Sequence, residues 1–108
     1  RDFTFVTNAV QANIKAMFAQ NINTSGDIFN IAVGERISLN NLIAVLQKLI
    51  GTRLEQTYGA ERAGDVRDSL ADISKAKKIL NYQPQIKIEE GLKYTLAWFK
   101  KQTVTENY

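Results

Sequence analysis

The residues between Tyr58 and Asp72 combine charge with backbone freedom in a pattern that suits ligand binding. This stretch holds two arginines, three aspartates and two glycines, and it shows no apolar periodicity. A tight turn at Gly64 would bring Arg62 and Asp65 into one small volume. A guanidinium matches phosphate oxygens and a carboxylate matches a vicinal diol such as a ribose, so the pair could bind a sugar nucleotide. A salt-bridged surface loop is the alternative interpretation.

What the chain lacks limits its other chemistry. It has no histidine and no cysteine, which excludes a Ser-His-Asp triad, a thiol nucleophile, a disulfide and the commonest metal ligands. No Gly-x-Gly-x-x-Gly or Walker loop is present, and no tyrosine stands four residues before a lysine. Glu89 and Glu90 are adjacent, as is typical of charges in a first helical turn. We therefore predict no catalytic residue, no metal site and no cofactor bound by this chain alone.

The charge balance is slightly basic, with 14 Lys and Arg against 11 Asp and Glu and a formal net charge of +3. Nucleic-acid-binding proteins gather basic residues on one stripe, often with interleaved aromatic side chains. The lysines at 75–78 and 100–101 instead fall late in expected helices, where cations favour the helix dipole. We therefore expect no nucleic-acid partner.

Length and composition are those of one soluble globular domain. A chain of 108 residues that is 44% hydrophobic and 23% charged can bury a sizeable core. No apolar run approaches the roughly 20 residues of a membrane span, and the start is unlike a signal peptide. We expect a cytoplasmic protein with no membrane partner. The chain begins with Arg1 rather than Met, so it looks cut from something longer.

Apolar periodicity and helix end signals predict four helices. They run from a Thr7 or Asn8 cap to about residue 20, from a Ser38 cap to Ile50 with Gly51 as the following residue, from an Asp72 cap to Leu80 with Asn81 left-handed, and from about 88 to 101. We expect their apolar stripes to be core, among them Val10, Ile14, Met17 and Phe18 in the first helix and Leu92, Leu96 and Phe99 in the last. Gly91 marks a close backbone approach.

Three short strands are predicted between these helices, over Asp2–Val6, Ile28–Val33 and Arg53–Tyr58. The apolar run at Ile28–Val33 suits a strand buried on both faces of a parallel sheet, and such sheets are covered by helices. The expected class is therefore α/β, with about four helices and a few short strands.

Several motifs agree in order and spacing with one known family. The segments RDFTFV, IFNIAVGERISLNNLIAVL, RAGDVRDSLADISKAKKIL with the following NYQPQ, and IEEGLKYTLAWF run nearly end to end along the chain. Together they resemble the C-terminal, substrate-binding part of the extended short-chain dehydrogenase/reductases, the NAD-dependent nucleotide-sugar epimerases and dehydratases. The likeness is strongest to the UDP-hexose 4-epimerase branch. It implies that residues 1–108 are the last third of such an enzyme.

The resemblance also implies roles for particular residues. Arg1 of the RDF motif and Arg62 of the RAGD motif would grip the substrate diphosphate, and Asp65 would bind the nucleotide ribose. Ser69 stands at the position that gates sugar size, where a small side chain leaves room for an N-acetyl group. Asp68 stands where relatives of this branch often have His, which is a departure near the sugar.

The partners follow from the same resemblance. They are a UDP-sugar, an upstream NAD-binding domain that holds NAD and the catalytic Tyr–Lys pair, and a second copy in a homodimer. The chain alone would then be inactive, and NAD would belong to the intact enzyme. The alternative function is a free-standing module that binds phosphates, nucleic acid or another protein.

Overall fold

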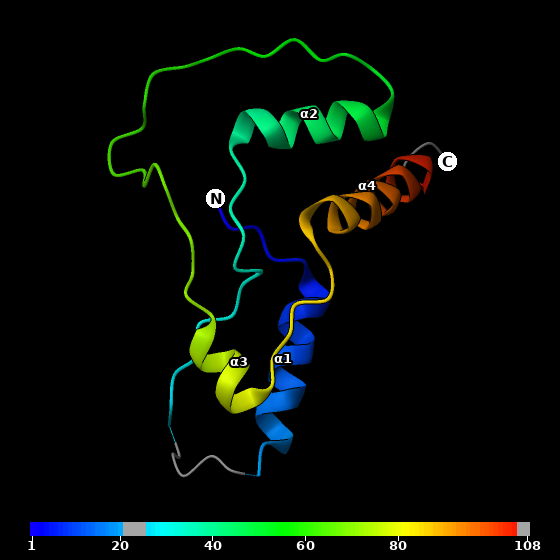
Figure 1. The fold of residues 1–108 in the computed structure, drawn as a ribbon. Helices are drawn as coiled ribbons and strands as arrows, with labels where there is room; N and C mark the ends of the chain where they lie inside the picture. Colours follow the sequence, from blue (N-terminus) through cyan, green and yellow to red (C-terminus); the bar gives the residue numbers. More distant parts are fainter. Residues whose placement is uncertain (21–25, 106–108) are drawn as a thin grey trace.

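The structure, a computed structural model, describes residues 1–20 and 26–105. It contains α1 (Val6–Phe18), α2 (Leu39–Ile50), α3 (Ser74–Leu80) and α4 (Ile88–Thr105), which confirms the four expected helices. Helix α1 packs beside α3 at one end of the molecule, and α2 packs beside α4 at the other (Figure 1). A long loop from Gly51 to Ile73 connects the two ends.

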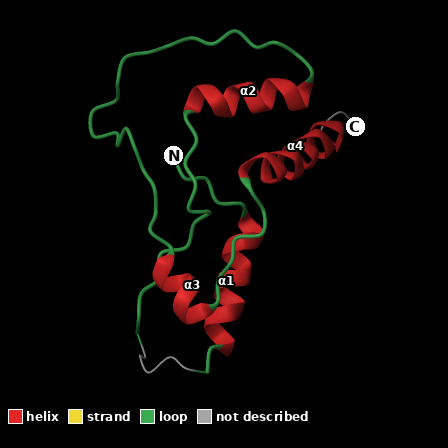
Figure 2. Ribbon diagram, viewed as in Figure 1, coloured by secondary structure: helices red, strands yellow, loops and turns green. Residues whose placement is uncertain are grey.

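None of the three expected strands is found within the described residues (Figure 2). A strand requires a neighbour that takes up its backbone hydrogen bonds. Here Arg1 and Ile37 exchange two such bonds, each of 2.9 Å, but the pairing extends no further. The N–H groups of Val33 and Gly34 donate to the side chain of Asp2 instead of to another strand.

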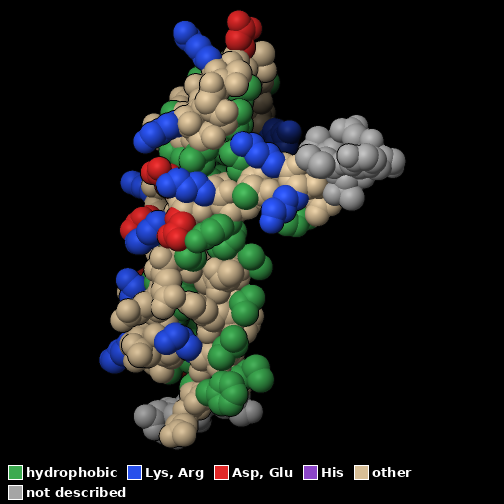
Figure 3. Space-filling model, turned by 90° about the vertical axis from the view of Figure 1, so that its right-hand side faces the viewer, with side chains coloured by type: hydrophobic (Ala, Val, Ile, Leu, Met, Phe, Trp, Pro, Cys, Tyr) green, Lys and Arg blue, Asp and Glu red, His purple; other side chains and the backbone are tan. Residues whose placement is uncertain are grey.

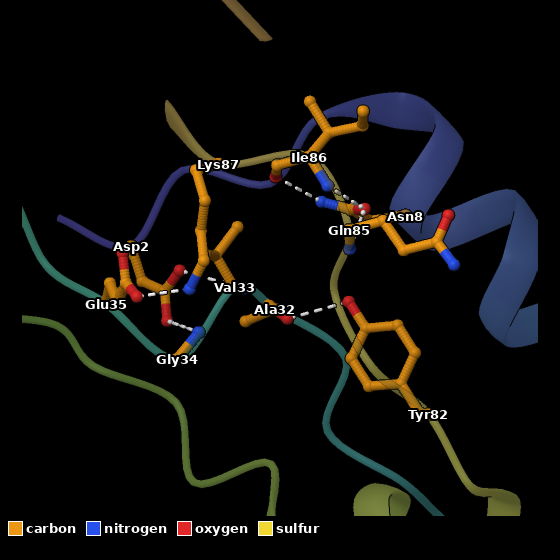
Figure 4. A network of polar contacts seen from close by, with 10 residues as sticks. All are labelled: Asp2, Asn8, Ala32, Val33, Gly34, Glu35, Tyr82, Gln85, Ile86 and Lys87. Atoms are coloured by element: carbon orange, nitrogen blue, oxygen red, sulfur yellow. Dashed lines mark hydrogen bonds and ion pairs between the residues drawn. The ribbon is translucent and has the colours of Figure 1, made fainter. Parts of the chain in front are cut away.

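Helix α1 begins two or three residues earlier than the expected caps imply, so the assignment of Thr7 or Asn8 as N-cap is wrong. Phe5 is the N-cap and makes no side-chain capping bond. Asn8 lies inside the helix and is fully buried. Its Oδ1 accepts from the N–H groups of Gln85 and Ile86 at 3.1 Å, and its Nδ2 donates to the Ile86 carbonyl at 2.8 Å (Figure 4). The Asn8 amide therefore joins α1 to the segment before α4 rather than capping its own helix.

Both ends of α2 and the C-terminal end of α3 follow the predicted local chemistry, but the assignment of Asp72 as N-cap of α3 is wrong, because Ile73 is the N-cap. The Ser38 hydroxyl accepts from the Asn41 N–H at 3.2 Å, and Gly51 closes α2 with a φ of 78°. Asn81 ends α3 in the left-handed conformation with a φ of 52°. Asp72 stands one residue before the N-cap of α3 and accepts from the Ser74 N–H at 2.9 Å, and hydrogen bonding from Ser74 lowers the pKa of the Asp72 carboxyl.

The core is small and lies between α1, α3 and the segment around Ala32. Three of its six buried members are alanines: the set is Ala12, Ala32, Ile73, Ala76, Leu80 and Tyr82. The Tyr82 hydroxyl donates to the Ala32 carbonyl at 2.7 Å. Burial raises the pKa of this hydroxyl, and the charge of Asp2 raises it further. The largest buried side chain is thus held by a hydrogen bond to backbone as well as by packing.

The molecule is more open than a self-contained domain of its size. Its radius of gyration is 17.4 Å, compared with about 13 Å for a compact chain of this length. Its accessible surface is 8791 Å², compared with about 6,100 Å² for a compact protein of this mass. The expectation of one globular domain with a sizeable core is therefore wrong for this chain in isolation.

Much of the excess surface is apolar and belongs to helix faces that were expected to be core. Met17 is 78% exposed and Phe18 75%, and Val10 and Ile14 are each 49% exposed. Helix α1 instead buries the face that carries Asn8 and Ala12. Figure 3 shows hydrophobic side chains gathered at the surface down one side of the molecule. The apolar stripe of α1 was identified correctly, but nothing in the described residues covers it.

Helix α4 shows the same pattern only in part. Phe99 is 58% exposed, so its expected burial is wrong, whereas Leu92 and Leu96 are half-buried. Gly91 is buried, and a Cβ at this position would lie 3.0 Å from the Phe5 Cβ. The close approach predicted at Gly91 is confirmed, and its partner is the Phe5 side chain.

Among the helices of residues 1–20 and 26–105, none has the length and apolar character needed to cross a membrane.

We expect Asn8→Ala to lower the free energy of unfolding by about 2 to 4 kcal/mol, because it leaves partly buried backbone groups of residues 85 and 86 without their Asn8 partner. Urea denaturation measures this loss. Asn13→Ala is the matched control, since Asn13 is an exposed asparagine of the same helix, and we expect a change within about 0.5 kcal/mol. Equal losses in the two variants would contradict a structural role for the Asn8 amide.

Candidate functional site

A charged cleft of about 620 Å³ lies between the N-terminal residues, the start of α2 and the long loop. Its charged lining residues are Arg1, Arg36, Arg67, Glu61, Asp65 and Asp68. Ile37, Ser38, Leu39 and Val66 complete the wall. The cleft therefore brings together the RDF motif, the residues before α2 and the RAGD loop, which are far apart in the sequence.

Arg1 and Asp65 meet in this cleft. The Arg1 guanidinium forms a close ion pair with Oδ1 of Asp65, and the two side chains are 30% and 58% exposed. The backbone of Arg1 is held by its two hydrogen bonds to Ile37. Two residues that are predicted to bind a nucleotide sugar, one from the first motif and one from the third, are thus in direct contact.

The turn predicted at Gly64 is present. The Asp65 N–H donates to the Arg62 carbonyl at 3.2 Å, and Gly64 has a φ of +81°. A positive φ at the third position is typical of a type II turn and favours glycine. The turn brings the backbones of Arg62 and Asp65 close together, but the Arg62 side chain is exposed and does not line the cleft. Arg62 makes no ion pair within the described part of the chain.

Ser69 is also outside the cleft lining, although it follows directly on Asp68. It is half-buried, on the stretch where the loop returns toward α3. Of the four predicted site residues, the structure therefore brings Arg1 and Asp65 together. Arg62 shares a turn with Asp65, and Ser69 stands apart from the cleft.

Three charged residues of the cleft received no predicted role: Arg36, and Glu61 and Arg67 of the stretch from Tyr58 to Asp72. Arg67 forms a close ion pair with Glu61. Arg36 stands 3.8 Å from a carboxylate oxygen of Asp68. One signal for Arg36 was available, because it lies between the apolar run ending at Gly34 and the Ser38 cap, and functional side chains concentrate on such short connections.

The Asp2 carboxylate positions the segments that form the cleft. Its Oδ1 accepts from the Val33 N–H at 3.1 Å, and its Oδ2 accepts from the N–H groups of Gly34 at 3.0 Å and Ala71 at 3.4 Å. Figure 4 shows Asp2 against Val33 and Gly34. One side chain thus joins the N-terminal residues, the segment before α2 and the end of the RAGD loop.

Gly34, which donates to Asp2, occupies a position where a larger residue would be strained. Its φ is +75°, and a Cβ there would lie 2.9 Å from Cδ1 of Ile73. Glu35, the next residue, pairs with Lys87 before α4 (Figure 4). The backbone around Gly34 is therefore fixed by packing, by the Asp2 carboxylate and by an ion pair.

The described residues contain neither an acidic cluster of the kind that holds a metal ion nor a glycine-rich turn of the dinucleotide-binding type. No group of three acidic side chains in them is close enough to hold a metal. The glycines with positive φ, at 26, 34, 51 and 64, stand in separate turns. None of these turns connects a strand to a helix in the described part, so they do not form the glycine-rich phosphate cradle of a dinucleotide fold.

No family model matches the chain. Among curated proteins, it is 39% identical over 102 residues to the UDP-glucuronate 4-epimerase of Thermodesulfobacterium geofontis, a match that covers 94% of this chain and 30% of that protein. It is 34% identical over 105 residues to a putative UDP-glucose 4-epimerase of Methanocaldococcus jannaschii, which covers 97% of this chain and 32% of that protein. The chain thus spans about a third of the length of the curated relatives it matches.

Solved structures give the same result. A UDP-glucose 4-epimerase of Thermotoga maritima, solved with UDP-glucose, matches with a TM-score of 0.86 and 37% identity over 95% of this chain and 32% of its own. A UDP-glucuronic acid 4-epimerase of Bacillus cereus, in complex with UDP-glucuronic acid and NAD, matches with a TM-score of 0.88 and 27% identity over 94% of this chain and 32% of its own. The chain is therefore homologous to a segment of the UDP-sugar 4-epimerases that makes up about one third of their length. These epimerases are NAD-dependent enzymes of the short-chain dehydrogenase/reductase fold.

Proposed function

We propose that this chain is the UDP-sugar-binding segment of an NAD-dependent UDP-sugar 4-epimerase. The observation that carries the proposal is the meeting of Arg1 and Asp65, which are 64 residues apart in the sequence, in one cleft. Their side chains suit the two parts of a nucleoside diphosphate: a guanidinium for phosphate oxygens and a carboxylate for the ribose diol. Similarity to UDP-sugar 4-epimerases over nearly the whole chain supports the same ligand class.

Binding would exchange partners within the cleft. In the free chain the charges of Arg1 and Asp65 neutralise each other. A nucleotide sugar provides a new partner for each of the two residues. Its diphosphate can accept from Arg1, and its ribose hydroxyls can donate to Asp65. Arg62 would then reach the diphosphate from the turn that it shares with Asp65. The exchange leaves neither charged group without a partner, because each one regains a charge-assisted hydrogen bond.

The segment's contribution to the reaction is positioning and charge neutralisation. NAD and the groups that move protons belong, in this proposal, to an NAD-binding domain of the intact enzyme. The uncovered apolar stripe of α1, which includes Met17 and Phe18, supports contact with such a domain, because exposed apolar patches of this kind mark interfaces. A homodimer of the intact enzyme and inactivity of the isolated segment are parts of the same proposal.

A module that binds nucleic acid is less well supported by the charges of the cleft. The cleft carries three arginines and three carboxylates, so its formal charge is balanced. A surface that binds a nucleic-acid backbone instead presents an excess of basic side chains along a stripe. The pairing of arginines with carboxylates favours a ligand that has both a diphosphate and hydroxyl groups.

The Ser69 position bears on the sugar that the enzyme accepts. By family resemblance, this residue faces the substituent at the far wall of the sugar pocket, and a serine leaves volume there. We propose that the intact enzyme accepts N-acetylated UDP-hexoses. Ser69 is half-buried, which is compatible with a wall residue.

We expect Arg62→Ala in the full-length protein to weaken UDP-sugar binding by about 2 to 3 kcal/mol, because it removes a charge-assisted contact to the diphosphate. Isothermal titration calorimetry with UDP-glucose measures the loss. Uridine is the control ligand, since it has no diphosphate, and its affinity should not change. Unchanged UDP-glucose affinity would mean that the Arg62 turn is a surface loop with no role in binding.

We expect Ser69→Tyr to suppress turnover of UDP-N-acetylglucosamine while UDP-glucose turnover survives. A rigid ring would clash with the acetamido group, whereas the smaller sugar only loses spare volume. Steady-state kinetics with the two substrates measures the asymmetry, and Ser69→Ala, which keeps the side chain small, should retain both activities. Equal loss of both activities in Ser69→Tyr would contradict the placement of Ser69 at the substituent.

A further inference from the structure

The three arginines of the cleft differ in how firmly they are already paired. Arg1 and Arg67 form close ion pairs with Asp65 and Glu61. Arg36 has Asp68 as its recorded partner at 3.8 Å, too far for a direct hydrogen bond. The side chains of Arg36 and Asp68 are 62% and 83% exposed, and an exposed pair of this kind contributes little free energy. Arg36 is thus the cleft arginine that is held most weakly by the protein itself.

The backbone that carries Arg36 is, by contrast, well fixed. Two residues before it, the Gly34 N–H donates to the Asp2 carboxylate. Directly after it, Ile37 exchanges two backbone hydrogen bonds with Arg1. Ser38 then caps α2. A weakly paired guanidinium on a fixed backbone can turn toward a ligand without moving the wall of the cleft.

The same contacts set Arg36 beside Arg1. Because Ile37 is paired with Arg1, the backbones of Arg1 and Arg36 cross the cleft wall next to each other, and both side chains line it. A diphosphate carries at least two negative charges spread over several oxygens, so it can accept from more than one guanidinium. Arg1 must first leave Asp65 to reach such a ligand, whereas Arg36 has no close hydrogen bond to break.

We propose that Arg36 is a further substrate-binding residue whose guanidinium contacts the diphosphate of the nucleotide sugar; this inference rests on the proposed function of the cleft. Arg36 meets the anion first and compensates its charge while Arg1 is still paired with Asp65. After the exchange of partners, Arg1 and Arg36 hold the diphosphate together. Arg36 takes no part in the chemical step and determines affinity.

Titration calorimetry of the full-length protein with UDP tests this assignment. We expect Arg36→Ala to weaken UDP binding about tenfold, the lower end of the range for a hydrogen bond to a charged group. Arg36→Lys should recover part of the affinity, because it keeps the charge but loses the planar donor pair. The affinity for uridine and the melting temperature should not change in either variant.

Arg53→Ala is the matched control, because Arg53 is an exposed arginine that does not line the cleft and makes no ion pair within the described residues. It removes the same charge from the protein, so any general electrostatic attraction of the ligand falls equally in both variants. We expect Arg53→Ala to bind UDP as the wild type does. The slope of UDP affinity against salt concentration should be smaller for Arg36→Ala than for Arg53→Ala.

The outcomes separate this inference from the proposed function. If the wild type binds UDP and Arg36→Ala binds it as tightly as Arg53→Ala does, the role of Arg36 is refuted while the nucleotide site stands. If Arg36→Ala weakens the binding of uridine as much as the binding of UDP, Arg36 does not contact the diphosphate and the inference is again refuted. If the wild type binds no UDP, the proposed function fails, and the role of Arg36 fails with it.

Discussion

The Asp2 carboxylate is the contact on which the arrangement of the cleft depends. It accepts hydrogen bonds from the backbone of Val33, Gly34 and Ala71, and so joins three segments that no β-ladder connects within the described residues. Backbone hydrogen bonds to a charged group contribute about 1.5 to 3 kcal/mol each. A single side chain therefore takes the place that strand pairing has in an ordinary α/β fold.

The position of the cleft residues follows from that contact. Because Asp2 is fixed, Arg1 is held beside Ile37, and its guanidinium reaches Asp65 in the loop whose other end Asp2 also binds. The long loop has few contacts of its own, since residues 51–68 are all exposed. The cleft is thus held at its rim by backbone contacts, while its charged side chains stay free to exchange partners with a ligand.

Sequence reasoning succeeded where structure depends on near neighbours. The Ser38 cap, the left-handed Gly51 and Asn81, and the turn at Gly64 each involve groups within a few residues of one another, so residue type alone predicts them. The four helices follow from apolar periodicity for the same reason.

Sequence reasoning failed where the outcome depends on which distant part of the molecule covers a helix face or binds a side chain. Periodicity located the apolar stripe of α1, but it cannot tell whether a partner covers that stripe, and Met17 and Phe18 are exposed here. Asn8 resembled a cap because asparagine often is one, yet its amide binds the backbone of residues 85 and 86, more than 75 residues away. Arg36 escaped notice because its place in the cleft results from the pairing of Arg1 with Ile37, a contact that no local pattern encodes.

A crystal structure of the full-length protein with UDP tests the exchange of partners most directly. We expect the diphosphate to lie against the Arg1 guanidinium, the ion pair between Arg1 and Asp65 to be open, and Asp65 to accept hydrogen bonds from the ribose hydroxyls. A structure in which UDP is bound elsewhere while Arg1 and Asp65 remain paired would contradict this exchange.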